Sequence, residues 1–376
     1  MVSWLSPFAV VLDADSLVAA DYGACATPLP AFSCASPYGT PALPGARVRC
    51  KRRRSCSDSV RAAREAEAEA RHETALPALQ AALGLYQSSL TTHATCGAPA
   101  LLPAPVCADS LPELVLSAEA GAPAPTLHLS APTGVASAPL VGCVHANASA
   151  SVATARLGTQ AFLLPPRSRV ALSSAASLPA LLPSLGTFTL LILDPPWEAV
   201  SPARGATYAA MTPNSLAALP VRQLCCPAGA LVAVWVTNRE RVRRLLYDRL
   251  FPAWGLTPLA EWRWLKVTRD GHPVLPLQAG AGSRRPYELL VLARSGEPCR
   301  TDVPPAVTLL SQPGPHSRKP RLFSLLRPHA REGPALELFA REVAAGATAW
   351  GNEPLRFQAA GCFAGAAETV GTLAGP

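Results

Sequence analysis

Phe188-Thr189-Leu190-Leu191-Ile192-Leu193, followed at once by Asp194-Pro195-Pro196-Trp197, has the pattern of a buried parallel strand that ends abruptly. A short apolar run that stops at an acid and two prolines delivers its polar residues to the carboxyl edge of a sheet. Open α/β sheets bind their ligands at that edge. We therefore expect Asp194 and the residues that follow it to lie in a functional site.

The tetrapeptide from Asp194 to Trp197 carries the groups needed to methylate an exocyclic amine of a base. Such a reaction requires both amine hydrogens to be held, so that the nitrogen lone pair turns toward the methyl donor. The Asp194 carboxylate can accept one hydrogen bond, and the carbonyl of Pro195 can accept the other. Trp197 offers a flat face for an unstacked base. The alternative is a turn that ends a strand and has no catalytic role.

Composition limits the class of protein. A chain of 376 residues has room for one large domain with an appendage, or for two domains, and its 49% hydrophobic residues allow a sizeable core. The 11 cysteines contain no C-x-x-C pair, which argues against a zinc site and a disulfide framework, so no metal is expected. The apolar stretch Met1–Leu12 has no basic lead, and no uncharged stretch reaches membrane-spanning length without Pro or polar interruption. We expect neither a signal peptide nor a membrane span.

The charge favours a partner rich in phosphate. The formal net charge is +8, and part of it is concentrated in the basic run from Arg47 to Arg54. Such a run is typical of a nuclear-import signal or a nucleic-acid-binding arm, and the alternative is a solvated basic loop. The nucleus is therefore the expected location, with the cytoplasm and the mitochondrion as alternatives.

The composition and the hydrophobic pattern of the sequence predict four regions. Residues 1–57 are expected to be disordered and to end in the basic run, and residues 58–155 form a poorly defined region with one helix near 58–90. Residues 156–362 alternate strands and helices as in an α/β domain, and residues 363–376 are a tail.

Within the α/β domain, the pattern predicts strands and helices in alternation. The expected strands are 187–193, 229–236, 259–267, 287–293, 335–339 and 348–351. One helix should begin at a Thr212 cap and run to about Leu224, and another should begin at an Asn238 cap and run to about Leu250. A short helix should end near Leu326.

No G-x-G-x-x-G loop is present, so a cofactor with an adenosyl group would need another site. Glu337-Leu338-Phe339-Ala340-Arg341 and the later Trp350-Gly351-Asn352-Glu353 can supply one. A strand that ends in Phe and Arg, followed by an Asn-Glu pair, offers a stacking face and hydrogen-bond partners for ribose hydroxyls and amino-acid groups.

Taken together and in this order, the motifs resemble the adenine-N6 methyltransferase family founded on the seventy-kilodalton subunit of the mRNA methyltransferase, and within it the methyltransferase-like protein 4 branch. The resemblance covers about residues 156–360. The motifs that carry it, besides the Asp-Pro-Pro-Trp tetrapeptide and the pair just quoted, are Gly158–Pro166, Trp235-Val236-Thr237-Asn238-Arg239, Ala260–Thr268, Pro286-Tyr287-Glu288 and His316-Ser317-Arg318-Lys319-Pro320.

This resemblance implies a Rossmann-like fold with permuted motif order, in which the catalytic strand precedes the cofactor strand. It also implies S-adenosylmethionine as the methyl donor and no metal. The catalytic residues carried over by position are Asp194, Pro195, Pro196 and Trp197. The residues carried over for the donor are Asp194, Lys319, Phe339, Arg341, Asn352 and Glu353. For Phe339 the alternative is a core aromatic at a strand end, and for Lys319 it is a solvated lysine.

The resemblance also implies that Glu198 to Met211 is a flexible loop that closes on the target nucleotide. Arg204 and Tyr208 in this loop could hold phosphate and stack a base, and Asn238 is a further candidate for binding substrate. Two positions depart from the branch, which has Asn where this chain has Ala199 and Tyr where it has Ala210. We expect these changes to weaken contacts of the loop with phosphate and base, and so to alter substrate affinity or preference.

The implied activity is methylation of the N6 amine of adenine in RNA or DNA. The candidate substrates are small nuclear RNA that carries 2′-O-methyladenosine and DNA adenine, including that of mitochondria. Two other classes stay open: a non-catalytic, nucleic-acid-binding partner of another methyltransferase, and a regulatory protein whose basic arm does the binding.

Overall fold

The computed structural model describes residues 2–13, 17, 20–22, 27–28, 58–93, 126–130, 135–139, 142–157, 160–197, 211–268, 270–278, 283–296, 302–314 and 317–364. Its largest feature is a mixed, mostly parallel sheet of 11 strands in the order β1-β2-β14-β12-β13-β11-β10-β15-β16-β9-β6. The strands are β1 (Val2–Ser6), β2 (Ala9–Leu12), β14 (Thr308–Ser311), β12 (Thr257–Lys266), β13 (Tyr287–Ser295), β11 (Ala230–Val236), β10 (Leu190–Leu193), β15 (Ala335–Leu338), β16 (Ala347–Gly351), β9 (Ser168–Leu172) and β6 (Val144–Asn147).

The middle of this sheet is parallel. Strand β10 pairs in parallel with β11 on one side and with β15 on the other, and β15 pairs in parallel with β16. After β10 the next strand of the chain, β11, lies on one side of it. The strand on its other side, β15, comes much later in the sequence, so the strand order reverses at β10. Ligands bind outside the carboxyl ends of the strands at such a reversal. The α/β, Rossmann-like fold predicted from the sequence is confirmed, and β10 precedes β15 as the permuted order requires.

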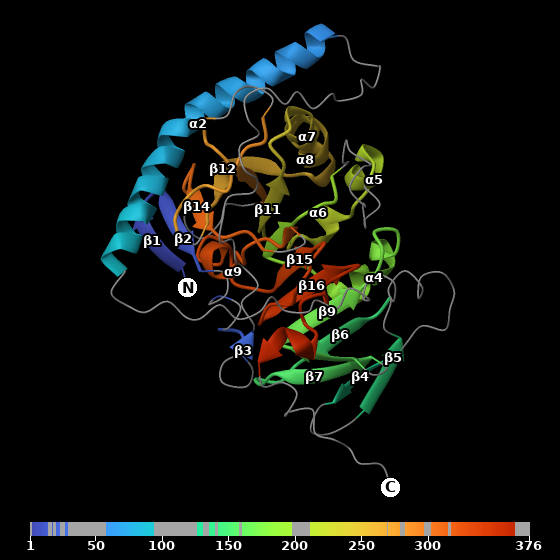
Figure 1. The fold of residues 1–376 in the computed structure, drawn as a ribbon. Coiled ribbons are helices and arrows are strands. Elements are labelled where there is room, and N and C mark those ends of the chain that lie inside the picture. Colours follow the sequence, from blue (N-terminus) through green and yellow to red (C-terminus); the bar gives the residue numbers. More distant parts are fainter. Residues whose placement is uncertain are drawn as a thin grey trace.

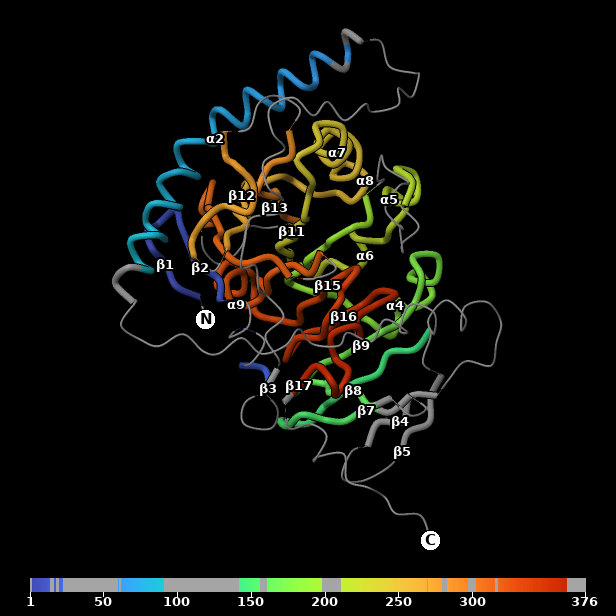
Figure 2. The backbone as a smooth tube through the Cα atoms, viewed as in Figure 1, coloured from blue at the N-terminus to red at the C-terminus, as the bar shows by residue number. Residues whose placement is uncertain are grey.

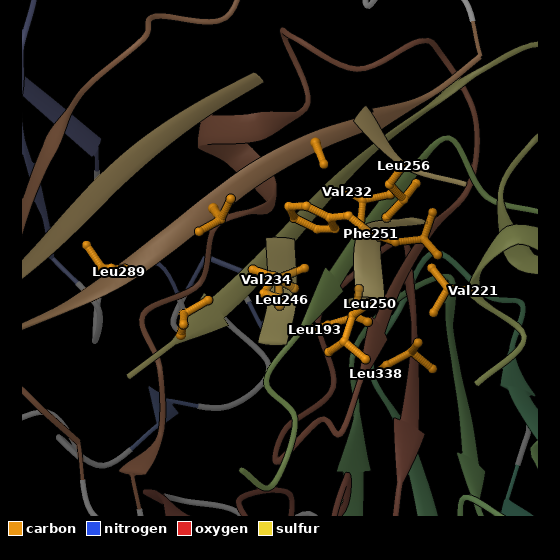
Figure 3. Close-up of a cluster of buried hydrophobic side chains, with 14 of the residues drawn as sticks. Leu193, Val221, Val232, Val234, Leu246, Leu250, Phe251, Leu256, Leu289 and Leu338 are labelled. Carbon is orange, nitrogen blue, oxygen red and sulfur yellow. The ribbon is translucent and has the colours of Figure 1, made fainter. Parts of the chain in front are cut away.

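Both faces of the sheet are covered because the central strands are apolar on both sides. Leu191 and Leu193 point to the face covered by α4 (Leu178–Leu185), α5 (Pro213–Ala217), α6 (Val221–Leu224), α7 (Glu240–Leu245) and α8 (Phe251–Trp254). Figure 3 shows part of this core, with Leu193 and Leu338 near Val232, Leu250 and Phe251. Leu190 and Ile192 point to the opposite face, where α9 (Phe323–Leu326) packs.

Two predicted helices differ in detail. Thr212 caps a helix as expected, since its side chain accepts a hydrogen bond from the Ser215 amide. The helix is broken into α5 and α6, because Pro220 has no N–H to continue it. Asn238 is not the cap of the next helix; Arg239 holds that position. A π-helical segment, Leu246–Leu250, then continues the helix into α8, and Gly255 ends it in the left-handed conformation at φ 64°.

A long helix, α2 (Asp58–His93), runs along the outside of the sheet beside β1 and β14 (Figure 1). Its buried residues include His72, Ala75, Leu79 and Ala82. The His72 Nε2 atom donates to the Leu277 carbonyl at 2.8 Å, and Nδ1 accepts from the Tyr287 hydroxyl at 3.2 Å. The helix predicted near 58–90 is thus confirmed, and it holds the segment between β12 and β13.

The N-terminal residues differ from the expectation. The prediction that residues 1–57 are disordered is wrong for residues 2–12, because β1 and β2 form a hairpin and β2 joins the large sheet beside β14. The basic run lies outside the described residues. Strands β4 (Thr126–Ser130), β5 (Val135–Pro139), β6 and β7 (Ala153–Leu157) were not predicted, because each is only four or five residues long and depends on pairing with other strands.

A second sheet has the order β5-β4-β7-β8, where β8 is Gln160–Leu164, and a pair joins β3 (Thr27–Pro28) to β17 (Phe363–Ala364). Strands β7 and β8 lie at the opposite end of the molecule from α2 (Figure 2). Among the described helices, none is long and apolar enough to cross a membrane.

The packing of α2 yields a matched test. Leu79 is fully buried, whereas Leu85 on the same helix is 42% exposed. We expect Leu79→Ala to lower the free energy of unfolding by about 2–5 kcal/mol and Leu85→Ala to lower it by less than about 0.5 kcal/mol. Urea unfolding followed by tryptophan fluorescence measures both. Equal losses for the two variants would contradict the docking of α2 on the sheet.

Candidate active site

Asp194 follows the last residue of β10, and Phe339 follows the last residue of the neighbouring strand β15. Between these strand ends lies a small hollow that opens to solvent. It is lined by Asp194, Arg318, Lys319, Glu337, Phe339, Arg341 and Glu342. The hollow therefore lies where the strand order reverses, at the place that the topology favours for a ligand.

Lys319 is the centre of the charged groups at this edge. Its Nζ atom lies 3.1 Å from Asp194 Oδ2 and 3.2 Å from Glu288 Oε2. Glu288 also accepts a hydrogen bond from Lys266, and Arg341 Nη2 lies 4.0 Å from Asp194 Oδ2. The side chains of Lys319 and Asp194 are 9% and 13% exposed, so the pair is largely removed from water.

Pairing keeps these groups charged. Burial works against the charged form of Lys319, but the Asp194 and Glu288 carboxylates outweigh it and raise the pKa of Lys319. Burial would raise the pKa of Glu288, yet Lys319 and Lys266 lower it to about 2. Lys319 is therefore a cation and Glu288 an anion at neutral pH. The alternative prediction that Lys319 is a solvated lysine is wrong, because it is buried and paired.

Backbone hydrogen bonds fold the tetrapeptide into a tight turn. The Trp197 amide donates to the Pro195 carbonyl at 2.8 Å, and the Trp197 indole Nε1 donates to the Trp235 carbonyl at 3.0 Å. The ring of Trp235 lies 5.9 Å from Lys319 Nζ. A carbonyl oxygen has two lone pairs, so Pro195 can accept a further hydrogen bond.

Phe339 has an unusual backbone conformation, with φ of 63°. Its ring meets Trp350 edge to face, with centroids 5.4 Å apart. Gly351 permits this close approach: its φ is 153°, and a Cβ there would lie 3.2 Å from the Phe339 Cα. Non-glycine residues at positive φ persist where surrounding structure enforces them, and such residues cluster at functional sites.

Comparison with known proteins finds a family model that matches the part of the chain that carries this site. Residues 188–353 match the family model MT-A70. This part of the chain is an MT-A70 domain. The resemblance predicted from the motifs is confirmed for the family, and matches to two METTL4 proteins support the predicted branch.

Three relatives illustrate the likeness. The N(6)-adenine-specific methyltransferase METTL4 of Homo sapiens is 36% identical over 211 residues, which are 53% of this chain and 44% of that protein. The N6-methyladenosine RNA methyltransferase MTA1 of Cryphonectria parasitica is 37% identical over 180 residues, 46% of this chain and 53% of that protein. The DNA N6-methyl methyltransferase of Caenorhabditis elegans is 35% identical over 179 residues, 47% of this chain and 48% of that protein. The matched part thus spans about half the length of these relatives.

The MT-A70 domain brings together some of the predicted site residues. Asp194, Lys319, Phe339 and Arg341 all line the hollow. Asn352 and Glu353 follow β16 and do not line it: Asn352 is exposed, and Glu353 is buried and paired with Arg356. Asn238 lies shortly after the end of β11, and its side-chain amide donates a hydrogen bond to the Tyr287 carbonyl. Arg204, Tyr208, Ala199 and Ala210 lie outside the described residues.

Sequence reasoning assigned no role to three charged residues of the site. Glu288 and Lys266 are in quoted motifs, and Glu337 is the first residue of another. A signal existed for each, because a charged residue within or at the end of an apolar strand rarely stays unpaired. Burial raises the pKa of Glu337 to about 8, and the nearby Glu342 and Asp194 add to the rise.

The raised pKa of Glu337 predicts that this side chain lowers the free energy of unfolding increasingly as pH rises. In the unfolded chain this carboxyl ionises near its ordinary pKa of 4.5, whereas in the folded domain it stays protonated up to about pH 8. Its contribution to stability therefore falls as pH rises from 4.5 to 8. We expect Glu337→Gln to stabilise the ligand-free protein at pH 7.5 by more than about 1 kcal/mol and to change little at pH 5.

Chemical unfolding at a series of pH values measures this effect. Glu73→Gln is the control, because that side chain is exposed on α2. Parallel stability profiles for Glu337→Gln and the wild type would show that the carboxyl ionises normally in the folded domain.

Proposed function

We propose that this chain is an S-adenosylmethionine-dependent methyltransferase that acts on the exocyclic N6 amine of adenine in nucleic acid. The observation that carries the proposal is the position of Asp194 and the Pro195 carbonyl at the end of β10, beside a hollow with charged groups of both signs. Relatives named as N6-adenine methyltransferases support it.

The residues of the hollow fit the chemistry of the donor, which carries a carboxylate, an ammonium, a ribose and an adenine. Lys319 and Arg341 suit the carboxylate or the ribose region, and Asp194 suits the ammonium. Phe339 offers a ring for stacking. Asn352 and Glu353, which follow β16 outside the hollow, are proposed for the ribose or the adenine edge. When bound, the donor supplies a methyl group on a sulfonium that is already a good leaving group.

In this proposal the protein acts mainly by positioning. Asp194 and the Pro195 carbonyl each hold one hydrogen of the amine, which turns the nitrogen lone pair toward the hollow. Pro196 keeps the turn rigid, and Trp197 stacks on the base. The proton leaves to water after transfer, so no general base with a tuned pKa is needed. Correct placement of two reactants can supply most of the rate.

The proposed substrate is RNA or DNA that contains adenine, either small nuclear RNA with 2′-O-methyladenosine or DNA. The names of the relatives include both an RNA and a DNA methyltransferase, which supports nucleic acid as the class. The net charge of +8 fits such a partner. Arg204, Tyr208 and Asn238 are proposed to contact the nucleic-acid substrate. The nucleus is the proposed location of the protein.

A non-catalytic binding partner is the second candidate. It would bind nucleic acid without transferring a methyl group, and it would tolerate loss of the tetrapeptide or of the donor residues. This chain keeps Asp194 to Trp197 together with Lys319, Phe339 and Arg341, which favours the enzyme.

Transfer of a labelled methyl from S-adenosylmethionine to oligonucleotides tests the proposal. The panel holds single-stranded RNA with and without 2′-O-methyladenosine, and single- and double-stranded DNA. We expect one class to be labelled and Asp194→Asn to lower kcat by about 10²–10³-fold, because the replaced oxygen no longer accepts a hydrogen bond in the transition state.

Asp248→Asn is the matched control, since that carboxylate is exposed and lies outside the hollow. Labelling that is equal in wild type and Asp194→Asn would refute the assigned role. Binding of nucleic acid with no labelling of any oligonucleotide would favour the non-catalytic partner.

A further inference from the structure

A buried ion network forms one wall of the hollow. Glu342 Oε2 accepts from Arg318 Nε at 3.0 Å, and Glu342 Oε1 lies 3.2 Å from Arg321 Nε. All three side chains are 5% exposed. Such buried charges are tolerated only when each has a partner, and loss of one partner leaves an uncompensated charge.

The residues of this network are sequence neighbours of Lys319 and Arg341, the two cations that face Asp194. Lys319 lies between Arg318 and Arg321 in the sequence, and Arg341 directly precedes Glu342. The peptide segments that carry Lys319 and Arg341 are therefore joined to each other by the ion pairs of their neighbours. A shift of Glu342 would move both cations relative to the end of β10.

Asp21 completes the network from a distant part of the sequence. Its Oδ2 atom accepts from Arg321 and, at 2.9 Å, from the Ala345 amide. With Asp21, two arginines face two carboxylates. Without it, Arg321 would have to share Glu342 with Arg318, and the turn after Arg341 would lose its hydrogen bond to a charged acceptor.

The next residue anchors Asp21 in place. The buried Tyr22 hydroxyl accepts from Gln358 Nε2, and Gln358 Oε1 accepts from the Val343 amide at 3.1 Å. The Tyr22 ring lies 4.6 Å from that of Phe363. Residues 341–345 are thus linked to this N-terminal segment at two points: Ala345 bonds Asp21 directly, and Val343 is linked to Tyr22 through Gln358.

We propose that Asp21 is a positioning residue of the methyl-donor site, which holds the segments of Lys319 and Arg341 so that both cations face Asp194. The inference rests on the proposed function and adds to the catalytic domain a residue that lies outside the matched family region. Asp21 does not line the hollow and acts through Arg321 and the Ala345 amide.

Donor affinity separates this role from simple stabilisation. In isothermal titration of the full chain with S-adenosylmethionine, we expect Asp21→Ala to raise the donor Kd by about tenfold, as for coupling through one shared network. In the transfer assay the donor KM should rise to a similar extent, while the KM for the oligonucleotide stays within about twofold. Asp21→Glu should recover part of the donor affinity.

Glu69→Ala is the matched control. The Glu69–Arg285 ion pair also joins the N-terminal region to the domain, and its side chains are 25% and 8% exposed, against 20% and 5% for Asp21–Arg321. We expect this variant to bind the donor as the wild type does. If thermal melting shows that Asp21→Ala is unfolded, Asp21→Asn replaces it, because the amide oxygen can still accept from Ala345.

The outcomes are distinguishable. Wild-type donor affinity in folded Asp21→Ala or Asp21→Asn, with only a lower Tm, would overturn this inference and leave the proposed function intact. An equal loss of affinity in Glu69→Ala would also overturn it, because the effect would then not belong to this network. Failure of the wild-type chain to bind the donor would overturn both proposals.

Discussion

The ion pair between Lys319 and Asp194 is the contact on which the rest of the site depends. Both side chains are mostly removed from water, and a buried charge that loses its partner typically costs several kcal/mol. The pair is held from both sides: Glu288 gives Lys319 a second carboxylate, and Lys266 balances Glu288. The site is therefore a nearly neutral cluster that presents separated charges of both signs, which suits a ligand that also carries both.

Topology supplies this cluster from parts of the chain that lie far apart. Strands β10 and β15 are parallel neighbours, so the residues after Leu193 and Leu338 meet at one edge. Strand β13 runs antiparallel to β11, and Leu289 pairs with Val236, the last residue of β11. Glu288 therefore lies just past the carboxyl end of β11, at the same edge of the sheet. The helix α2 fixes Tyr287, the neighbour of Glu288, through His72.

Much of the catalytic domain could be predicted from local patterns. Apolar runs marked β10, β11, β12, β13, β15 and β16, and the motifs at their ends marked Asp194, Lys319, Phe339 and Arg341. The edge hairpin β1–β2 was missed, because β2 is held in the sheet by pairing with the distant strand β14 and β1 by pairing with β2. The bonds of Glu288 to Lys319 and of Asp21 to Arg321 were not predictable, since an ion pair between distant residues leaves no periodic signal. The strands between residues 126 and 157, in and just beyond the region predicted to be poorly defined, were missed for the same reason, because they depend on tertiary pairing.

The central claim is that Lys319 and Asp194 act as one unit in holding the donor. A double-mutant cycle on the affinity for S-adenosylmethionine, with Asp194→Asn, Lys319→Met and the double variant, measures this most directly. The account predicts a coupling free energy of more than about 1 kcal/mol, because residues in one ion network are not additive. Additive losses would show that the two side chains act independently and would contradict the account.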